Sequence, residues 1–147
     1  TVYFKKHQCV TIKSEEEKIK GNYKVFPEAK ILVVDDEELN LLLLKELLQD
    51  RCGKVACASG GKEAYDMVKE EAFDLIIMDL LMPGVDGVTS SKMIRQFDEY
   101  KDVPIICYSA NANNLNQKEL LEEYFEDYLV KPIHVEGLFE VLSKYLS

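Results

Sequence analysis

The chain has 147 residues, of which 47% are hydrophobic, and this length suits one domain with a buried core plus some additional chain. The formal net charge is −9, and it is uneven: six lysines and three glutamates give residues 1–27 a net charge of +3, which leaves −12 on residues 28–147. An acidic domain of this kind is a poor partner for nucleic acid or an anionic membrane, and both function classes are disfavoured.

The cysteines and the hydropathy pattern indicate a cellular location. The four cysteines lie mostly in apolar runs, without CxxC spacing or pairing with histidine: Cys9, Cys52, Cys57 and Cys107. We interpret them as reduced core thiols and expect a cytoplasmic protein. The sequence has no run of about 18 apolar residues and no signal-peptide pattern. We therefore expect no direct membrane contact by this chain, although a parent protein could be membrane-anchored.

The first 29 residues differ in pattern from the rest. Residues 1–13 contain β-type residues, and residues 14–29 form a charged stretch in which Pro27 is the last turn signal. We interpret residues 1–29 as an N-terminal tail and linker, and expect the folded domain to comprise residues 30–147.

From Lys30 onward, short apolar runs alternate with helical patterns. Five runs have the length and composition of buried strands: ILVV (31–34), KVACA (54–58), DLIIM (74–78), VPIICY (103–108) and YLV (128–130). Strands that alternate with helices predict a parallel sheet with right-handed crossovers. We therefore predict an α/β fold of the flavodoxin-like, doubly wound type: a three-layer sandwich with five parallel strands in the order 2-1-3-4-5.

The predicted helices show apolar residues at three- and four-residue spacing. The first, residues 37–49, places four leucines on one face, and Cys52-Gly53 is expected to end it with glycine at the C′ position. The other helices are expected at residues 61–70, 88–97, 116–124 and 135–146, of which 116–124 is mostly acidic and weakly amphipathic.

The stretch IIMDLLMPGVDG, residues 76–87, ends a buried strand at a single acid, Asp79. Pro83 and Gly84 cannot continue the strand, so this carboxylate lies at its carboxyl end. Asp79 alone is equally compatible with a turn or helix-cap acid that accepts backbone N–H groups. The ends of the other strands distinguish the two interpretations.

Four of the five predicted strands end in reactive side chains: Asp35 and Asp36 after the first, Asp79 after the third, Ser109 after the fourth and Lys131 after the fifth. The carboxyl ends of parallel strands share one edge of the sheet, so these groups are expected to converge. In the order 2-1-3-4-5 the ligand crevice lies between the first and third strands, which carry the acids.

The charges of this cluster predict phosphoryl chemistry. Three crowded carboxylates repel unless a cation lies among them, and oxygen ligands without Cys or His favour Mg²⁺ (or Mn²⁺). Three aspartates, one divalent cation and Lys131 sum to zero charge, which suits a site that accepts a phosphoryl group on a carboxylate. The alternative is a structural ion pair between Lys131 and Asp79, which explains one pair but not four strand ends.

Four segments carry a resemblance to a known family: ILVVDDEELN, IIMDLLMPGVDG, PIICYSAN and DYLVKPI. In this order and spacing they resemble the receiver domains of response regulators and hybrid sensor kinases in two-component systems, over about residues 30–146. The resemblance implies a phosphorelay receiver that takes a phosphoryl group from a phosphohistidine, catalyses its own phosphorylation and dephosphorylation, and changes conformation.

The resemblance also implies the roles of individual residues. Asp79 would be the phosphoacceptor, Asp35 and Asp36 the metal-binding pair, and Leu81 would give its backbone carbonyl to the metal. The remaining roles are a phosphate-pairing lysine, a switch hydroxyl, a switch aromatic and a cis-peptide position: Lys131, Ser109, Tyr128 and Pro132.

Two departures from the family pattern are visible. The family often carries Gly shortly before the fifth strand, where this chain has Tyr124, so the end of the fourth helix is expected to be irregular. Ser109 stands where Thr is also common, which keeps the hydroxyl and loses a methyl group.

The origin and the partners follow from the same resemblance. The segment TVYFK resembles the closing strand of a histidine kinase ATP-binding domain, which implies the C-terminal receiver of a hybrid histidine kinase; an arbitrary apolar tail is the alternative. His7 and His134 do not stand in the pattern of a phosphodonor. We therefore expect the donor to be a histidine kinase or histidine phosphotransfer domain, and any homodimer to be weak.

Three rival functions differ in their sequence requirements. A haloacid-dehalogenase-like phosphohydrolase needs two aspartates separated by one residue after the first strand, whereas Asp35 and Asp36 are adjacent and Asp79 is followed by two leucines. A receiver-like binding module that is not phosphorylated would lack the acid pair or Lys131. A flavin carrier needs a phosphate-binding loop where this chain has DDEELN, whose acids repel phosphate.

Overall fold

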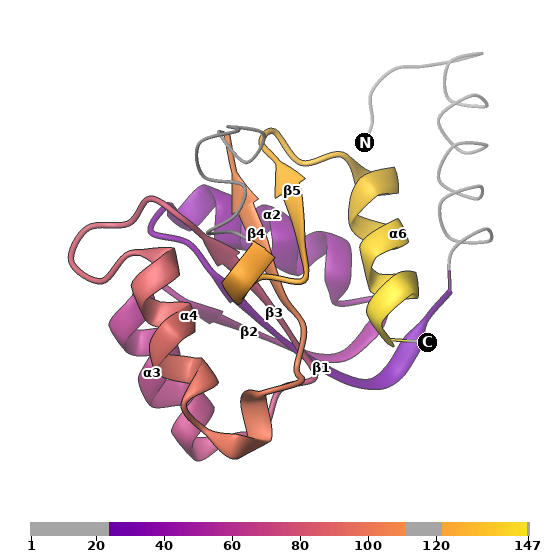
Figure 1. The fold of residues 1–147 in the computed structure, drawn as a ribbon. Helices are drawn as coiled ribbons and strands as arrows, with labels where there is room; N and C mark the ends of the chain where they lie inside the picture. Colours follow the sequence, from indigo (N-terminus) through magenta and orange to yellow (C-terminus); the bar gives the residue numbers. More distant parts are fainter. Residues whose placement is uncertain (1–23, 111–121, 147) are drawn as a thin grey trace, which may run out of the picture.

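The computed structural model describes residues 24–110 and 122–146, in which strands and helices alternate along the chain (Figure 1). The strands are β1 (Phe26–Val34), β2 (Cys52–Ala58), β3 (Leu75–Asp79), β4 (Ile105–Ser109) and β5 (Asp127–Val130). The helices are α2 (Glu38–Leu48), α3 (Gly61–Glu70), α4 (Gly87–Arg95), the short 3-10 helix η1 (Asp98–Tyr100) and α6 (Val135–Leu146). The strands pair in parallel in the order β2-β1-β3-β4-β5, which confirms the predicted fold class.

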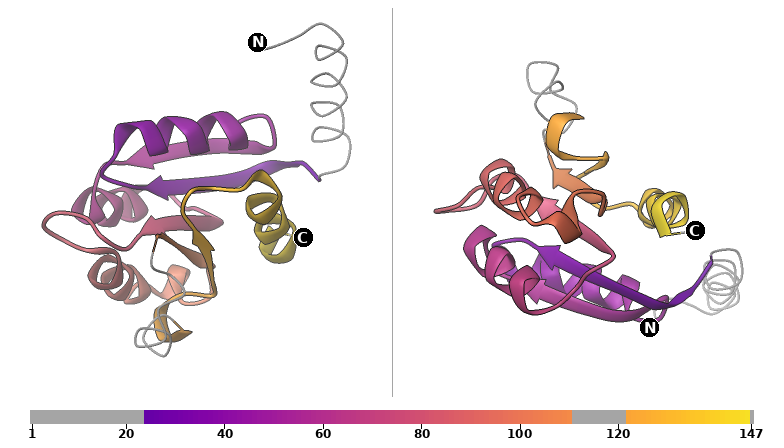
Figure 2. Two further views of the ribbon diagram at one scale, coloured as in Figure 1. Left: turned by 90° about the horizontal axis from the view of Figure 1, so that it is seen from above. Right: turned by 60° about the horizontal axis from the view of Figure 1, so that its bottom comes forward.

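The sheet is buried on both faces because its central strands alternate two sets of apolar side chains. Leu32 and Val34 of β1 point to one face, where Ala64 and Val68 of α3 and Ile94 of α4 pack against them. The neighbouring residues of β1 point to the other face, which α2 and α6 cover with four leucines: Leu44, Leu48, Leu138 and Leu142. Figure 2 shows these helices on opposite sides of the sheet, so the three-layer arrangement is also confirmed.

Strand β1 begins at Phe26, five residues before the predicted strand 31–34, so residues 26–29 lie in a strand and not in a linker. The Phe26 N–H donates to the Arg51 carbonyl oxygen at 2.5 Å, and the register to β2 then shifts before Lys30. Pro27 lies in this irregular stretch, and β3 pairs with β1 only from Ile31. The N–H that proline lacks is therefore not needed by either ladder.

The prediction that Gly53 ends the first helix was wrong. The C-cap residue of α2 is Gln49, whose backbone has the ordinary right-handed helical conformation. Gly53 is the second residue of β2. A Cβ atom at Gly53 would collide with the carbonyl oxygen of Pro27. Glycine is required here because β1 and β2 approach closely, not because the chain turns.

The other helices differ little from their predicted bounds. The ranges of α3 and α6 agree with the predictions, and α4 begins one residue earlier and ends two residues earlier. Most of the predicted helix at 116–124 lies outside the described residues, and its described part, residues 122–124, is helical. In the described part of the chain, no helix has the length and apolar character needed to cross a membrane.

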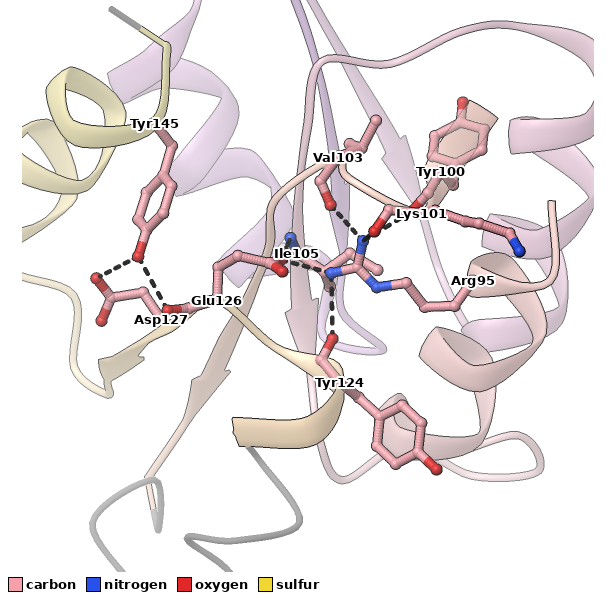
Figure 3. Close-up of polar contacts among 9 residues, drawn as sticks. All are labelled: Arg95, Tyr100, Lys101, Val103, Ile105, Tyr124, Glu126, Asp127 and Tyr145. Carbon is pink, nitrogen blue, oxygen red and sulfur yellow. Dashed lines mark hydrogen bonds and ion pairs between the residues drawn. The ribbon is translucent and has the colours of Figure 1, made fainter. Parts of the chain in front are cut away.

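Arg95, the last residue of α4, contacts the segments that lead into β4 and β5 (Figure 3). Its guanidinium donates, at 2.6 to 3.3 Å, to the backbone carbonyl oxygens of Tyr100, Lys101, Val103 and Tyr124. It also pairs with the Glu126 carboxylate at 2.5 Å, and the same carboxylate oxygen accepts a hydrogen bond from the Ile105 N–H at 2.8 Å. Arg95 therefore connects α4 to the residues that precede β4 and β5.

Candidate functional site

The strands β1 and β3 are neighbours and deliver their acids to the same edge of the sheet. Val34 pairs with Met78, so Asp35 and Asp79 follow at the same level on adjacent strands. Carboxylate oxygens of Asp35, Asp36 and Asp79 all lie within 4.8 Å of one another. The predicted convergence of the three acids is therefore present in the structure.

Asp35 is fully buried, and the first turn of α2 holds its carboxylate. Oδ1 accepts a hydrogen bond from the Glu37 N–H at 2.8 Å, and Oδ2 accepts one from Asn40 Nδ2 at 3.0 Å. The Asp35 N–H donates to the Ala58 carbonyl oxygen of β2 at 3.2 Å. Asp36 is exposed, which leaves its carboxylate accessible from solvent.

Asp79, the last residue of β3, is almost fully buried. Burial and the neighbouring carboxylate of Asp35 raise the pKa of Asp79 from 3.8 to about 6, and Lys131 only partly offsets them. A carboxylate in this situation gains stability from any further positive charge beside it. The oxygen-only donor set and its uncompensated charge therefore fit a hard divalent cation such as Mg²⁺.

Lys131 follows β5 and reaches both buried acids. Its Nζ atom lies 3.3 Å from Oδ2 of Asp35 and 3.3 Å from Oδ2 of Asp79. Burial opposes the ammonium charge, yet the carboxylates of Asp79 and Asp35 outweigh it and raise the pKa of Lys131 above its ordinary value. Nζ also lies 4.8 Å from the centre of the Tyr108 ring. The Lys131–Pro132 peptide bond is cis, as the family resemblance implied.

Ser109 ends β4 and is buried at the same edge of the sheet. Its carbonyl oxygen accepts a hydrogen bond from the Lys131 N–H at 3.1 Å, so the backbones that carry these two residues are joined directly. The prediction that the polar ends of the fourth and fifth strands lie together is confirmed.

The loop after Asp79 is closed by the start of α4. The Gly87 N–H donates to the Leu80 carbonyl oxygen at 2.9 Å, and Asp86 caps the helix by accepting from the Thr89 N–H at 2.8 Å. Leu81 lies in this loop with an exposed side chain. The role of its carbonyl as a metal ligand stays a prediction.

Tyr128 lies on β5 opposite Cys107 of β4, and its side chain is 41% exposed. Its role as a switch residue stays a prediction. Before this strand, Arg95 donates to the carbonyl oxygen of Tyr124, near the position where the family often has glycine. His134 is exposed and lies just before α6, so it is not on the face of a helix as a phosphodonor histidine would be. His7 lies outside the described residues.

Two residues of the site were not singled out in the sequence, Asn40 and Tyr108. Asn40 stands five residues after Asp35 in DDEELN, so a helix that starts directly after the acids turns its side chain back toward them. This spacing could have identified Asn40. The contact between Tyr108 of β4 and Lys131, which follows β5, joins residues far apart in the sequence, and the sequence has no local signal for it.

The arrangement provides a carboxylate nucleophile, two further acids for a cation, and an ammonium and a hydroxyl at the same edge. The carboxylate can attack an electrophilic phosphorus, and the positive groups can neutralise the charge on the transferred oxygens. These are the components that the sequence predicted for phosphoryl transfer.

Known proteins are similar to this chain in sequence and in fold. The sensor protein GacS of Pseudomonas syringae pv. syringae is 38% identical over 119 residues, which cover 79% of this chain but 13% of GacS, so this chain spans a small part of that relative. A similar solved structure is the receiver domain of the sensor histidine kinase PA1611 from Pseudomonas aeruginosa PAO1, which has a magnesium ion coordinated in its active site cleft. The two structures superpose with a TM-score of 0.73 at 28% identity, and the match covers 81% of this chain and 98% of that chain.

A further similar structure contains a partner. The co-crystal structure of the Saccharomyces cerevisiae phosphotransfer protein Ypd1 with the receiver domain of Ssk1 gives a TM-score of 0.74 at 28% identity, covering 83% of this chain and 91% of that one. The family profile described as response regulator receiver domain matches residues 31–143. The chain therefore belongs to the receiver domains of two-component response regulators.

Proposed function

We propose that this receiver domain accepts a phosphoryl group on Asp79 from a phosphohistidine. The observation that supports this most strongly is the position of Lys131, whose Nζ atom bridges the buried carboxylates of Asp79 and Asp35. A structural ion pair needs one acid, whereas this lysine contacts two, and Asp36 adds a third carboxylate close enough for the three acids to hold a cation.

In the proposed phosphoryl transfer, Asp79, Lys131 and Ser109 each have a separate role. An oxygen of the Asp79 carboxylate attacks phosphorus, a P–O bond forms, and the P–N bond to the donor imidazole breaks with its electron pair returning to nitrogen. Lys131 pairs with a phosphoryl oxygen, and the Ser109 hydroxyl donates to another. In hydrolysis, water replaces the Asp79 oxygen on phosphorus and regenerates the carboxylate.

Mg²⁺ or Mn²⁺ is the proposed cofactor. Asp36 and Asp79, with support from Asp35 and the Leu81 carbonyl, would hold the cation, which supplies charge neutralisation for the phosphoryl oxygens. The support is the mutual closeness of the three carboxylates and the raised pKa of Asp79.

The proposed donor is a histidine kinase or a histidine phosphotransfer domain. Helix α2 starts two residues after Asp36, and its first half exposes three leucines: Leu39 is 78%, Leu42 55% and Leu43 44% exposed. A helix that carries a phosphohistidine and apolar neighbours could cover this surface and reach Asp79. We further propose a hybrid histidine kinase as the parent, because relatives such as GacS are much longer sensor proteins.

The cellular compartment that we propose is the cytoplasm. Cys52, Cys57 and Cys107 are unpaired thiols, and burial raises the pKa of Cys52 to about 11 and that of Cys107 to about 12. Such thiols are unreactive and are typical of a reducing environment.

The proposal is tested by intact mass after incubation with acetyl phosphate and Mg²⁺. We expect one added phosphoryl group in the wild type, none in Asp79→Asn and none after chelation of the cation. Asp98→Asn, which removes an exposed acid far from the site, is the matched control and should incorporate phosphate normally. Incorporation that survives Asp79→Asn or chelation would reject the proposal. Unmodified wild type would favour the binding-module alternative.

A further inference from the structure

Asp35 receives more support than an ion pair with Lys131 alone would provide. Oδ1 accepts from the Glu37 N–H at 2.8 Å, and Oδ2 accepts from Asn40 Nδ2 at 3.0 Å while Lys131 Nζ lies 3.3 Å from the same oxygen. A carboxylate only accepts hydrogen bonds, so the amide nitrogen of Asn40, and not its oxygen, must face it. Two of the three donors are therefore uncharged.

Both uncharged donors belong to the start of α2. Glu37 is the N-cap and Asn40 is the third residue of the helix. The backbone N–H and the side-chain amide therefore both come from the N-terminal end of α2, and each donates to a different oxygen of Asp35. The N-terminal end of the helix also favours negative charge at this place.

The charged donor, by contrast, is shared. Lys131 Nζ lies equally far, 3.3 Å, from Oδ2 of Asp79. A phosphoryl group on Asp79 brings about two negative charges and three acceptor oxygens, so the ammonium shifts its pairing toward them. Asp35 is fully buried, and a buried carboxylate without donors is strongly disfavoured.

We propose that Asn40 is a positioning residue for the metal and phosphoryl site. It holds the Asp35 carboxylate in place when Lys131 pairs with the phosphoryl group, and it fixes the orientation of Asp35 toward the cation. This inference rests on the proposed function and deepens it, because it assigns the orientation of the Asp35 carboxylate to Asn40, a hydrogen-bond donor that carries no charge.

The test measures Mg²⁺ binding by isothermal titration calorimetry, with no phosphodonor present. Asn40→Leu keeps the approximate shape and removes the donor, and we expect Mg²⁺ affinity to fall by about 10- to 100-fold, as for other groups that orient metal ligands. Asn40→Gln keeps an amide and should recover part of the affinity. Gln49→Leu makes the same kind of change at the exposed end of α2 and should bind Mg²⁺ like the wild type.

The outcomes separate a positioning role from a packing role. Mg²⁺ affinity of Asn40→Leu within twofold of the wild type would overturn the inference, and so would equal weakening in Asn40→Leu and Asn40→Gln. If Asn40→Leu does not fold in urea titrations, Asn40→Ala takes its place with the same expectation. Wild-type protein that takes up no phosphoryl group rejects the proposed function; phosphorylated wild type with an unaffected Asn40→Leu rejects only the inference.

Discussion

The Nζ atom of Lys131 lies 3.3 Å from Oδ2 of Asp79, yet this ion pair does not bring the acid to its ordinary pKa. Burial and the carboxylate of Asp35 keep the pKa of Asp79 at about 6. The negative charge around Asp79, the proposed nucleophile, is therefore only partly neutralised by Lys131.

Removal of the Asp79 charge should stabilise the metal-free protein. The folded-state pKa is raised from 3.8 to about 6, so the stabilising contribution of the protonated acid is complete below about pH 3.8 and is lost as the pH rises through about 6. We expect Asp79→Asn to raise the free energy of unfolding by about 1–3 kcal/mol at pH 7 without divalent cations. Urea unfolding between pH 4 and 7 should show this gain shrinking as the pH falls. The control Asp98→Asn should change stability by less than about 0.5 kcal/mol, and an equal gain there would contradict the assignment.

Removal of the ammonium should raise the pKa of Asp79 further. Lys131 is the group that lowers this pKa, so Lys131→Met leaves burial and Asp35 without opposition. We expect the Asp79 carboxyl, followed by the pH dependence of its ¹³C resonance in metal-free protein, to titrate above the wild-type value. Lys144→Met removes a lysine that pairs with Asp127 at 3.3 Å and should leave the Asp79 titration unchanged. A lower or equal pKa in Lys131→Met would show that the ion pair is unimportant for protonation.

The hydroxyl of Ser109 should couple phosphorylation to the surface. A two-state element responds only to contacts that differ between its states, and a hydroxyl drawn toward a phosphoryl oxygen is such a contact. It would pull on Ala110, and the ring of Tyr128, now 41% exposed, could turn inward. We expect beryllofluoride, a mimic of the phosphoryl group, to shift the amide signals of Ala110 and Tyr128 in the wild type. Ser109→Ala should still incorporate phosphate but lose these shifts, and identical shifts in both proteins would refute the coupling.

The exposed leucines of α2 should matter for the protein donor and not for a small one. We expect Leu42→Ser to slow phosphotransfer from the cognate phosphohistidine protein by about 5- to 30-fold, which corresponds to about 1–2 kcal/mol of lost apolar contact. Phosphorylation by acetyl phosphate should be unchanged, because this surface does not touch Asp79. Val25→Ser, at another exposed apolar residue, is the matched control. Rapid transfer to Leu42→Ser would place the donor on a different surface.

Loss of the Arg95 guanidinium should weaken the fold at the end opposite the site. The side chain satisfies four backbone carbonyl oxygens and the Glu126 carboxylate (Figure 3). We expect Arg95→Met to lower the free energy of unfolding by about 2–4 kcal/mol, because these groups lose a shared donor. Arg95→Lys should recover little, since an ammonium cannot reproduce the planar fork. The exposed Lys92 on the same helix provides the control Lys92→Met, and equal losses in both would indicate a charge effect alone.

Local sequence patterns were sufficient for the strand order, the acids and the lysine. An apolar run that ends at Asp79 predicts a buried strand with a carboxylate at its tip, and parallel topology then brings Asp35 and Lys131 to the same edge. These predictions succeeded because a strand's burial and its end depend on residues that are adjacent in sequence. The prediction for Gly53 was wrong because a glycine that follows a helix can either end the helix or allow two strands to approach closely. Residues adjacent in sequence do not distinguish these two roles.

The sequence by itself determined the fold class and which side chains meet at the edge of the sheet, because alternating apolar runs and the residues at their ends specify both. Only the tertiary structure decided where β1 begins, why Gly53 must be glycine, that Asn40 faces Asp35, and that Arg95 joins four carbonyl oxygens with Glu126. Each of these depends on how closely two segments approach after the sheet has formed. That distance is set by the packing of the whole core and not by neighbours along the chain.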